Sequence, residues 1–390
     1  MKRDTAALLM GVLLLGLTGR AGFSAEATAS PPTAAGATHH YLYVFPVGSV
    51  DIYDMDHSFR LVKRISLSLT SIGVRGAGVH AASHSLYLSY GGAGGSTGTG
   101  ALLRYDLLSN RVRWMRHYTF GIDSLAITPN GKKVYLPTGE STEGDSWEVI
   151  RPSDGEVMGV IHAESRPHDT VVSLNGRHVY MGGAGDDYLM EAGTATDRVI
   201  KKIGPLLHGI RPFTINGRET LAFTTEDDFL GFQVSDIRSG RVLYTVPVQG
   251  FSFPPGGGLG NTPSHGIALS PDEKQVWVID QPNSYVHVFD VSNLPGSQPR
   301  QVDDIRLTGH MEGSESPCAY YCERTGWLGM SRNGRFLFVG DAGDVIDTRT
   351  RRTVAVLPAL YNARVFLEID FRRGVPVFAT RREAIGYVTR

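Results

Sequence analysis

The sequence predicts an all-β fold, a seven-bladed β-propeller made of four-stranded antiparallel blades and closed by pairing of the N- and C-terminal strands. Three observations support this prediction. A short apolar strand, a polar turn and an alternating strand with an aromatic residue recur along the chain. A second hairpin follows each copy of this unit. No long stretch shows the periodicity of an amphipathic helix.

The first residues have the pattern of a signal peptide. Two basic residues precede the apolar run Ala6–Gly19, which is shorter than the ~20 residues of a membrane span. Ala25-Glu26-Ala27 fits a cleavage site, so residues 1–27 are predicted to be removed on export. The alternative is a buried N-terminal helix. Residues 28–40 are predicted to be a flexible linker, and the mature protein is expected to be periplasmic or secreted, without a membrane span.

Residues 41–390 carry the repeat and are predicted to form the propeller domain. Its clearest copies are Gly121–Pro137, Arg166–Met181 and Ser264–Asp280, each with an Asn-Gly or Pro-Asp turn. Four further copies are Gly76–Tyr90, Arg211–Thr225, Thr325–Asp341 and Arg364–Thr380. One aromatic residue aligns in every copy: Tyr87, Tyr135, Tyr180, Phe223, Trp277, Phe338 and Phe378. Their spacings of 40 to 61 residues fit propeller blades, two of them lengthened by insertions.

The second hairpins complete four strands per unit. Examples are Ser146–His162, Phe229–Val246 and Tyr285–Leu307. Dividing the 350 residues from 41 to 390 among seven units gives 50 residues per blade. This favours one domain, although the length alone would suggest two or three.

The stretches Ile127–Leu136 and Ile267–Asp280 resemble the YVTN/YncE-like propeller repeat. That repeat lies within the superfamily that includes the quinoprotein amine dehydrogenase β-chain propellers. The chain lacks the Gly-His…Trp-Asp signature of WD40 repeats and the Asp boxes of sialidases, which favours this resemblance. The resemblance covers nearly the whole chain after the linker and implies a fold, but no single function.

Ring closure is expected to combine both ends of the chain. Residues 41–67 read as the second, third and fourth strands of a blade, and residues 364–390 read as a first, second and third strand. A composite blade would protect the sheet edges at the closure. The two ends supply two strands more than a ring of 28 needs, so one terminal hairpin is expected to lie outside the regular blades.

Composition excludes several classes of protein. The 38 basic and 39 acidic residues leave a net charge of −1, which argues against nucleic-acid binding. Two cysteines exclude a scaffold built on disulfides and a cysteine-rich metal protein. Glycine, 47 of 390 residues, is well above its usual ~7%, as expected of a chain rich in turns.

The connections on one face of the ring are long. In a propeller, the connections after the second and fourth strands of each blade lie on the same face. Here these are Gly91–Gly100, Thr138–Asp145, Gly250–Pro263 and Thr308–Glu323, whereas the turns on the other face are short. Long loops in a compact fold are usually functional, so a ligand site is expected where they overhang the central channel.

The residues that enter the first strands are the candidate ligand-binding residues. Five of the seven are arginine, and acidic and imidazole side chains stand beside them. Converging arginines would form a positive funnel suited to a carboxylate or a phosphate. Alternatively, each arginine pairs with an acid of an adjacent blade and staples the ring; the two roles are compatible. The candidates are Arg75, Asp123, Arg166, His168, Arg211, His265, Arg324 and Arg364.

Histidine and cysteine add two further expectations. His80, His168 and His265 are candidate metal ligands, although no HxH or HExxH spacing joins two of them, and each could instead be exposed or bonded to the backbone. Cys318 and Cys322 are predicted to form a local disulfide in an exported protein. Free thiols and metal ligation are the alternatives for these cysteines.

Together, these features predict an exported propeller that binds a protein partner or a small anionic ligand on its loop-rich face, without catalysis. One alternative is a lactonase-like hydrolase, which would need a divalent metal. Another is the propeller subunit of a periplasmic oxidoreductase, whose redox cofactor sits elsewhere. The sequence itself requires no cofactor, and the fold alone does not decide among these functions.

Overall fold

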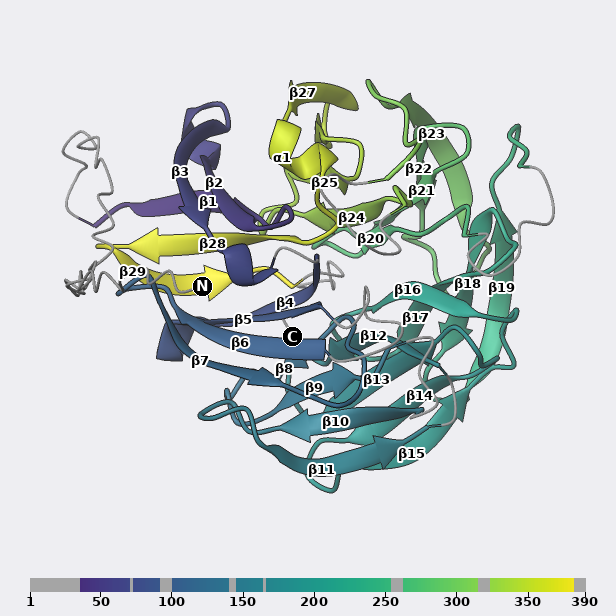
Figure 1. Ribbon diagram of the computed structural model, residues 1–390. Helices are drawn as coiled ribbons and strands as arrows, with labels where there is room; N and C mark the ends of the chain where they lie inside the picture. The colour runs from purple at the N-terminus through teal and green to yellow at the C-terminus, as the bar shows by residue number, and fades with distance from the viewer. Residues whose placement is uncertain are drawn as a thin grey trace, which may run out of the picture. The chain divides into compact units, whose positions relative to one another are not determined.

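Seven antiparallel sheets form a ring of blades, which confirms the predicted seven-bladed β-propeller (Figure 1). The computed structural model describes residues 36–70, 73–91, 100–139, 145–163, 166–253, 262–314 and 323–381, and from Gly36 onward the chain is one compact unit. The predicted signal peptide and both cysteines lie outside these residues. In the described part of the chain, no helix is long and apolar enough to cross a bilayer.

The first three blades follow the predicted order of four strands, with the first strand innermost. Blade 1 contains β4 (Val74–His80), β5 (Ser85–Gly91), β6 (Gly100–Asp106) and β7 (Arg111–His117). Blade 2 contains β8 (Ala126–Ile127), β9 (Val134–Pro137), β10 (Ser146–Ile150) and β11 (Val157–His162). Blade 3 contains β12 (Pro167–Val172), β13 (His178–Gly183), β14 (Leu189–Gly193) and β15 (Arg198–Ile203).

The next three blades repeat this arrangement. Blade 4 contains β16 (Ile210–Ile215), β17 (Leu221–Glu226), β18 (Gly231–Asp236) and β19 (Arg241–Pro247). Blade 5 contains β20 (Ile267–Leu269), β21 (Gln275–Asp280), β22 (Tyr285–Asp290) and β23 (Arg300–Arg306). Blade 6 contains β24 (Trp327–Met330), β25 (Phe336–Gly340), β26 (Asp344–Asp347) and β27 (Arg352–Val356). The single α-helical turn α1 (Pro358–Tyr361) leads to blade 7, and the 3-10 turns are η1 (Met55–His57), η2 (Ser68–Thr70) and η3 (Ala81–Ser83).

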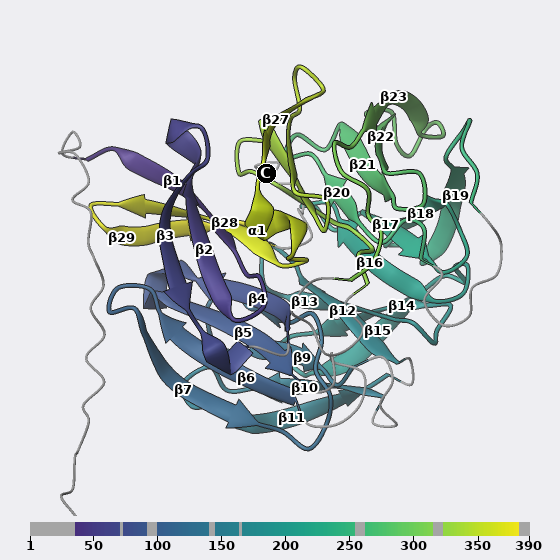
Figure 2. The same ribbon diagram turned by 45° about the horizontal axis from the view of Figure 1, so that its top comes forward.

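Blade 7 joins the two ends of the chain, as predicted. Its strand order is β29 (Val375–Ala379), β28 (Phe366–Arg372), β1 (Thr38–Val44), β2 (Ser49–Asp54) and β3 (Arg60–Ser66). All seven residues of β1 pair with β28, and Figure 2 shows the yellow C-terminal strands beside the purple N-terminal strands. The N-terminal end of the chain therefore supplies three of the four regular strands of this blade.

The fifth strand corrects one detail of the sequence analysis. The repeat copy Arg364–Thr380 placed Phe378 in a second strand, but β1 occupies that position and β29 pairs with the opposite edge of β28. On this channel side, β29 and the ends of β4, β8 and β12 surround a cavity of about 320 Å³. The strand predicted for residues 384–390 lies outside the described residues.

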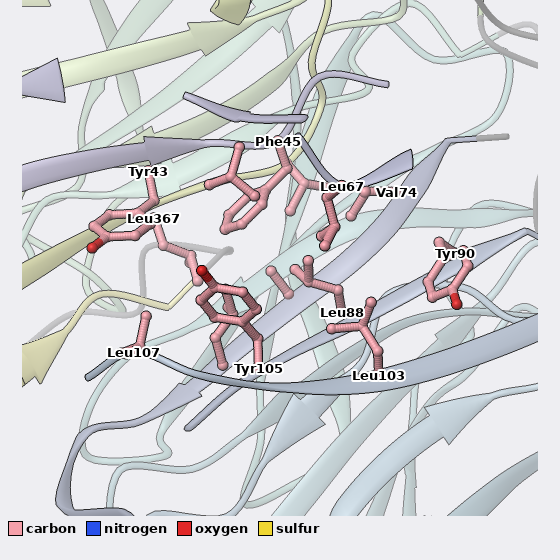
Figure 3. Close-up of a cluster of buried hydrophobic side chains, with 14 of the residues drawn as sticks. Tyr43, Phe45, Leu67, Val74, Leu88, Tyr90, Leu103, Tyr105, Leu107 and Leu367 are labelled. Carbon is pink, nitrogen blue, oxygen red and sulfur yellow. The ribbon is translucent and has the colours of Figure 1, made fainter. Parts of the chain in front are cut away.

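The core consists of apolar layers between neighbouring blades. Figure 3 shows the layer between blades 7 and 1, where Tyr43 and Leu367 face Leu88, Leu103 and Tyr105. Alternating strands explain these layers, because each strand sends apolar side chains to both neighbouring blades. The outermost strands run along the rim of the ring (Figure 1) and show alternating exposure, as in β7 and β15.

The innermost strands pack so closely that some positions have no space for a side chain. A Cβ on Gly76 would lie 2.6 Å from the backbone nitrogen of Leu125 in the neighbouring blade. A Cβ on Gly266 would lie 3.0 Å from the nitrogen of Leu328. Both glycines directly follow candidate site residues, so the close approach of first strands fixes where those side chains stand.

Candidate functional site

The candidate residues lie where the first strands leave the regular ladder at the loop-rich face. β-Bulges occur at Arg75, at His168 and at Arg211-Pro212, where the pairing register with the second strand of the same blade shifts. Asp123, His265 and Arg324 precede the first strands of blades 2, 5 and 6. A bulge redirects a side chain and ends local pairing, so this geometry releases the side chains from the sheets toward the channel.

Asp123 and His168 form a buried pair across the boundary of blades 2 and 3. The Nδ1 of His168 lies 3.0 Å from Oδ2 of Asp123, and their side chains are 5% and 6% exposed. The Ser124 nitrogen donates to the His168 carbonyl, and the Ser89 hydroxyl donates to the Asp123 carbonyl. Contacts from both neighbouring blades therefore hold the backbone of this pair. A carboxylate at Nδ1 fixes the orientation of the imidazole ring.

A second histidine and a tryptophan come against this pair. The ring centroids of His168 and His265 lie 5.4 Å apart. Trp327 approaches His265 edge to face at 5.0 Å and His168 at 6.1 Å. The Nδ1 of His265 lies 3.3 Å from the Thr325 hydroxyl. Blades 2, 3, 5 and 6 thus contribute one cluster at the axis of the ring, which we call the channel cluster: Asp123, His168, His265 and Trp327.

Asp341 fixes the backbone that presents the tryptophan. Its Oδ2 accepts hydrogen bonds from the nitrogens of Thr325 and Gly326, at 3.2 and 3.1 Å. Gly326 has a φ of +82°, a conformation that residues with a side chain rarely adopt. The buried carboxylate and the glycine turn therefore place Trp327 at the start of β24.

Two of the candidate arginines make reciprocal links between blades 6 and 7. Arg324 donates to the carbonyls of Glu312 and Tyr361 and to Oδ1 of Asn362, and it stacks over the Tyr361 ring at 4.0 Å. Arg364 donates in return to the carbonyl of Glu323, directly before Arg324. These contacts match the stapling role, although the partners are mainly backbone oxygens rather than acids.

The other three arginines differ from one another. Arg211 forms an ion pair within its own blade, with Nη2 3.1 Å from Oδ2 of Asp227. Arg166 has a φ of +43°, and its side chain packs against Gly185, where a Cβ would lie 2.9 Å from it. Arg75 is buried at the bulge of blade 1. The arginines thus enter their blades at equivalent positions but make different contacts.

The structure separates the three candidate metal ligands. His168 and His265 belong to the channel cluster, whereas His80 ends β4 on the turn face and bonds Ser83 through Nδ1 at 2.8 Å. Burial lowers the pKa of His80. Among the described residues at the loop-rich end, no three His, Cys, Asp or Glu side chains bring ligand atoms within 4.8 Å of one another.

Two buried acidic side chains, Asp344 and Glu226, differ in what they contact. Asp344 accepts from the Thr308 nitrogen and hydroxyl, at the start of one long loop. Glu226 ends β17 and is buried, and this burial raises its pKa well above the ordinary value, which favours the neutral acid. Asp344 thus anchors a long connection, whereas burial determines the protonation of Glu226.

Sequence reasoning identified three members of the channel cluster and missed Trp327. This tryptophan lies three residues after Arg324 and was counted only as part of a strand. A signal for it was present, because His168 and His265 likewise lie one or two residues after a residue that enters a first strand, and Trp327 lies three residues after one. The expected disulfide of Cys318 and Cys322 falls outside the described residues and stays a prediction.

Comparisons with solved structures support the fold. A gluconolactonase from the periplasm of Pseudomonas aeruginosa matches with a TM-score of 0.58 at 16% identity, over 88% of this chain and 99% of that one. Hydrazine synthase of Kuenenia stuttgartiensis matches with a TM-score of 0.52 at 16% identity, over 71% of this chain and 77% of that one. Neither the family models nor the curated proteins gave a match. At this identity the likeness shows a propeller and no activity.

Proposed function

We propose that this chain is an exported propeller of the YVTN type that binds a small anionic molecule at the loop-rich end of its channel. The observation that carries the proposal is the channel cluster, which brings Asp123, His168, His265 and Trp327 from four blades to one place. Two imidazoles and an indole supply donors and aromatic faces there. Arginines enter the neighbouring strands at the same level.

The charge of Arg324 supports an anionic ligand. Its side chain is buried, and it donates hydrogen bonds to two carbonyl oxygens and one amide oxygen, all neutral. Among the described residues, no carboxylate lies within ion-pair distance of it. A buried cation without a matching charge is costly, so an anion that docks beside it would gain binding energy.

Calorimetric titration with dicarboxylates, sugar acids and inorganic phosphate tests the proposal. Binding should also change the fluorescence of Trp327, one of four tryptophans in the chain. Trp327→Phe should remove that change, whereas Trp114→Phe, on the outer strand β7, should leave it intact. The titration should find at least one of these anions with a saturable site.

Arginine variants give the test its control. Replacing Arg166 and Arg324 together by alanine should weaken binding at least ~100-fold, because each charge-assisted hydrogen bond contributes about 1.5–3 kcal/mol. Since Arg324 also links blades 6 and 7, a thermal melt must accompany the titration. A folded double variant with a lower melting temperature and unchanged affinity would leave only the stapling role.

The hydrolase alternative makes a different prediction. A lactonase-like enzyme would turn over a sugar lactone only with a divalent metal, and chelation would abolish that turnover. Assays of lactone hydrolysis with and without added Mn²⁺ or Zn²⁺ separate catalysis from binding. An oxidoreductase subunit would instead copurify with a second chain.

A further inference from the structure

A second cluster of charged groups lies at the junction of the two chain ends. His40, on β1, stands directly opposite Asp370, on β28. Its Nδ1 lies 2.7 Å from Oδ1 of Asp370 and 3.2 Å from Oε1 of Glu368. Both carboxylates are buried, with side chains 0% and 3% exposed, whereas His40 is 35% exposed.

Neighbouring elements hold the far oxygens of both carboxylates. Arg332, in the turn between β24 and β25 of blade 6, donates Nη1 to Oδ2 of Asp370 at 2.9 Å. The backbone nitrogen of the same residue donates to Oε2 of Glu368 at 2.7 Å. The Arg332 guanidinium also covers the Phe378 ring of β29 at 4.0 Å, and the Thr380 hydroxyl accepts from the Glu368 nitrogen. One group of contacts therefore ties β1, β28, β29 and blade 6 together.

The charges at this junction balance only when one proton is present. Two ionised carboxylates face a single arginine, so a second positive charge on His40, or a proton on Glu368, is needed for neutrality. The remaining charged groups nearby are Asp56, which accepts from the His40 nitrogen, and His39, 3.9 Å from Asp56. Asp56 adds negative charge and strengthens the need for that proton.

We propose that this junction is a pH-sensitive latch, in which one proton shared by His40 and Glu368 closes the ring and its loss loosens blade 7. Without the proton, the two buried carboxylates repel each other, and the single charge of Arg332 does not neutralise both. The strain would fall on β1 and β29, which pair with the two edges of β28. The latch is independent of the anion site, which lies at the opposite end of the channel.

The pKa shifts of Glu368 and His40 support a loss of stability as pH rises. Burial raises the pKa of Glu368 to about 7, and the charge of Asp370 adds to the effect. Burial alone would lower the pKa of His40, but the hydrogen bond to Asp370 and the surrounding negative charges outweigh it, so the pKa is raised. In both cases the folded state holds the proton more tightly than the unfolded state. Stability therefore falls as pH rises from about 4.5 through 7, and further as His40 loses its proton.

Glu368→Gln provides the main test, because glutamine keeps the shape of the protonated acid and cannot ionise. Melting temperatures of wild type and variant should be compared from pH 5 to 9 in buffer with EDTA. The wild type should lose about 2–5 °C relative to the variant between pH 5.5 and 8.5. Hydrogen exchange, corrected for its intrinsic pH dependence, should rise at pH 8.5 in peptides from β1, β28 and β29, and much less in blade 3.

A matched pair elsewhere in the ring is the control. His178 lies 2.6 Å from Glu219 and 3.6 Å from Glu191, away from the closure. Glu219→Gln should leave the pH response of β1 and β28 unchanged. His40→Gln, at a half-exposed position, should fold and reduce the response even if Glu368→Gln does not fold.

Two results would overturn the latch. One is a difference in melting temperature between wild type and Glu368→Gln that is the same at pH 5.5 and pH 8.5. The other is alkaline exchange that rises equally in every blade, because the effect would then not originate at the junction.

Discussion

Three of the recurring aromatic residues, Tyr87, Tyr135 and Tyr180, contact the following blade through their hydroxyls. The Tyr135 hydroxyl donates to Oδ1 of Asp197 at 2.7 Å, and Tyr180 bonds Glu219 at 3.1 Å. In blade 5, Trp277 takes the same place and Arg351 covers its ring at 4.6 Å. Burial raises the pKa of Tyr135 and Tyr180, so the hydroxyls remain donors across the physiological range.

Removal of one such hydroxyl should cost a measurable part of the stability. Tyr135→Phe keeps the buried ring and should lower the free energy of unfolding by about 0.5–1.5 kcal/mol, since Asp197 keeps its ion pair with Lys133. Tyr244→Phe is the control, because its hydroxyl bonds the Pro295 carbonyl near the surface and its loss should cost less. Denaturant unfolding measures both. Both bonds join neighbouring blades and differ in burial, so equal losses would mean that burial of the hydrogen bond has no special weight.

For individual residues, the sequence predicted which positions matter better than it predicted their hydrogen-bond partners. It identified the recurring aromatic residues and, from strand entries, Asp123, His168 and His265. It did not identify Asp197 or Glu219 as partners of the tyrosines, because these acids lie on turns about 40 to 60 residues farther along the chain. The bulges that turn His168 and Arg211 out of the ladder were also invisible, since a bulge changes register without changing the alternation of residue types.

The innermost strands are the elements that place the channel cluster. They lie close together, so their spacing depends on residues without side chains, such as Gly76, which faces the backbone of Leu125. The outer strands have no such constraint. Gly159 on β11, for example, has its nearest neighbour atom, on Val149, 3.9 Å from where a Cβ would be.

Alanine at these two glycines should therefore have opposite effects. Gly76→Ala should destabilise the protein by about 1–3 kcal/mol, because a Cβ 2.6 Å from a backbone nitrogen forces β4 and β8 apart. It should also weaken any ligand binding that depends on Arg75. Gly159→Ala should be neutral or slightly stabilising, because glycine within a strand costs conformational entropy. Thermal and denaturant melts measure both, and a tolerated Gly76→Ala would contradict the close packing.

Strand identity was predicted well, and strand neighbours were predicted less well. The alternating residues 375–381 correctly indicated a strand. This strand, β29, pairs with the channel side of β28 and does not take the place of the second strand of blade 7. Periodicity reports which residues face a core, but not which of two competing strands takes an edge. β1 takes that edge along seven residues, with its last three buried, whereas β29 is partly exposed.

From Gly36 onward the chain forms a ring in which every blade packs on two neighbours, and the covalent chain connects each blade to the next. The two chain ends meet inside blade 7, where only strand pairing joins β1 to β28, and apolar residues pack this blade against blade 1 (Figure 3). The pH-sensitive latch acts at the same place. A substitution that disrupts the pairing of β1 with β28 should therefore destabilise the whole ring.

Proline substitutions in β1 and β29 test this view. Leu42, fully buried in β1, pairs with Glu368 on one side and Tyr53 on the other. Leu42→Pro removes a backbone donor and a buried side chain, and should cost more than ~3 kcal/mol, enough to open the ring. Val377, 38% exposed, lies at an irregularity of the β28–β29 ladder, so Val377→Pro should cost less than ~1 kcal/mol. Circular dichroism melts and limited proteolysis should show a cooperative fold for Val377→Pro and an open or unfolded chain for Leu42→Pro. If Leu42→Pro melts within a few degrees of the wild type, β1 does not close the ring and the remaining strands hold blade 7 without it.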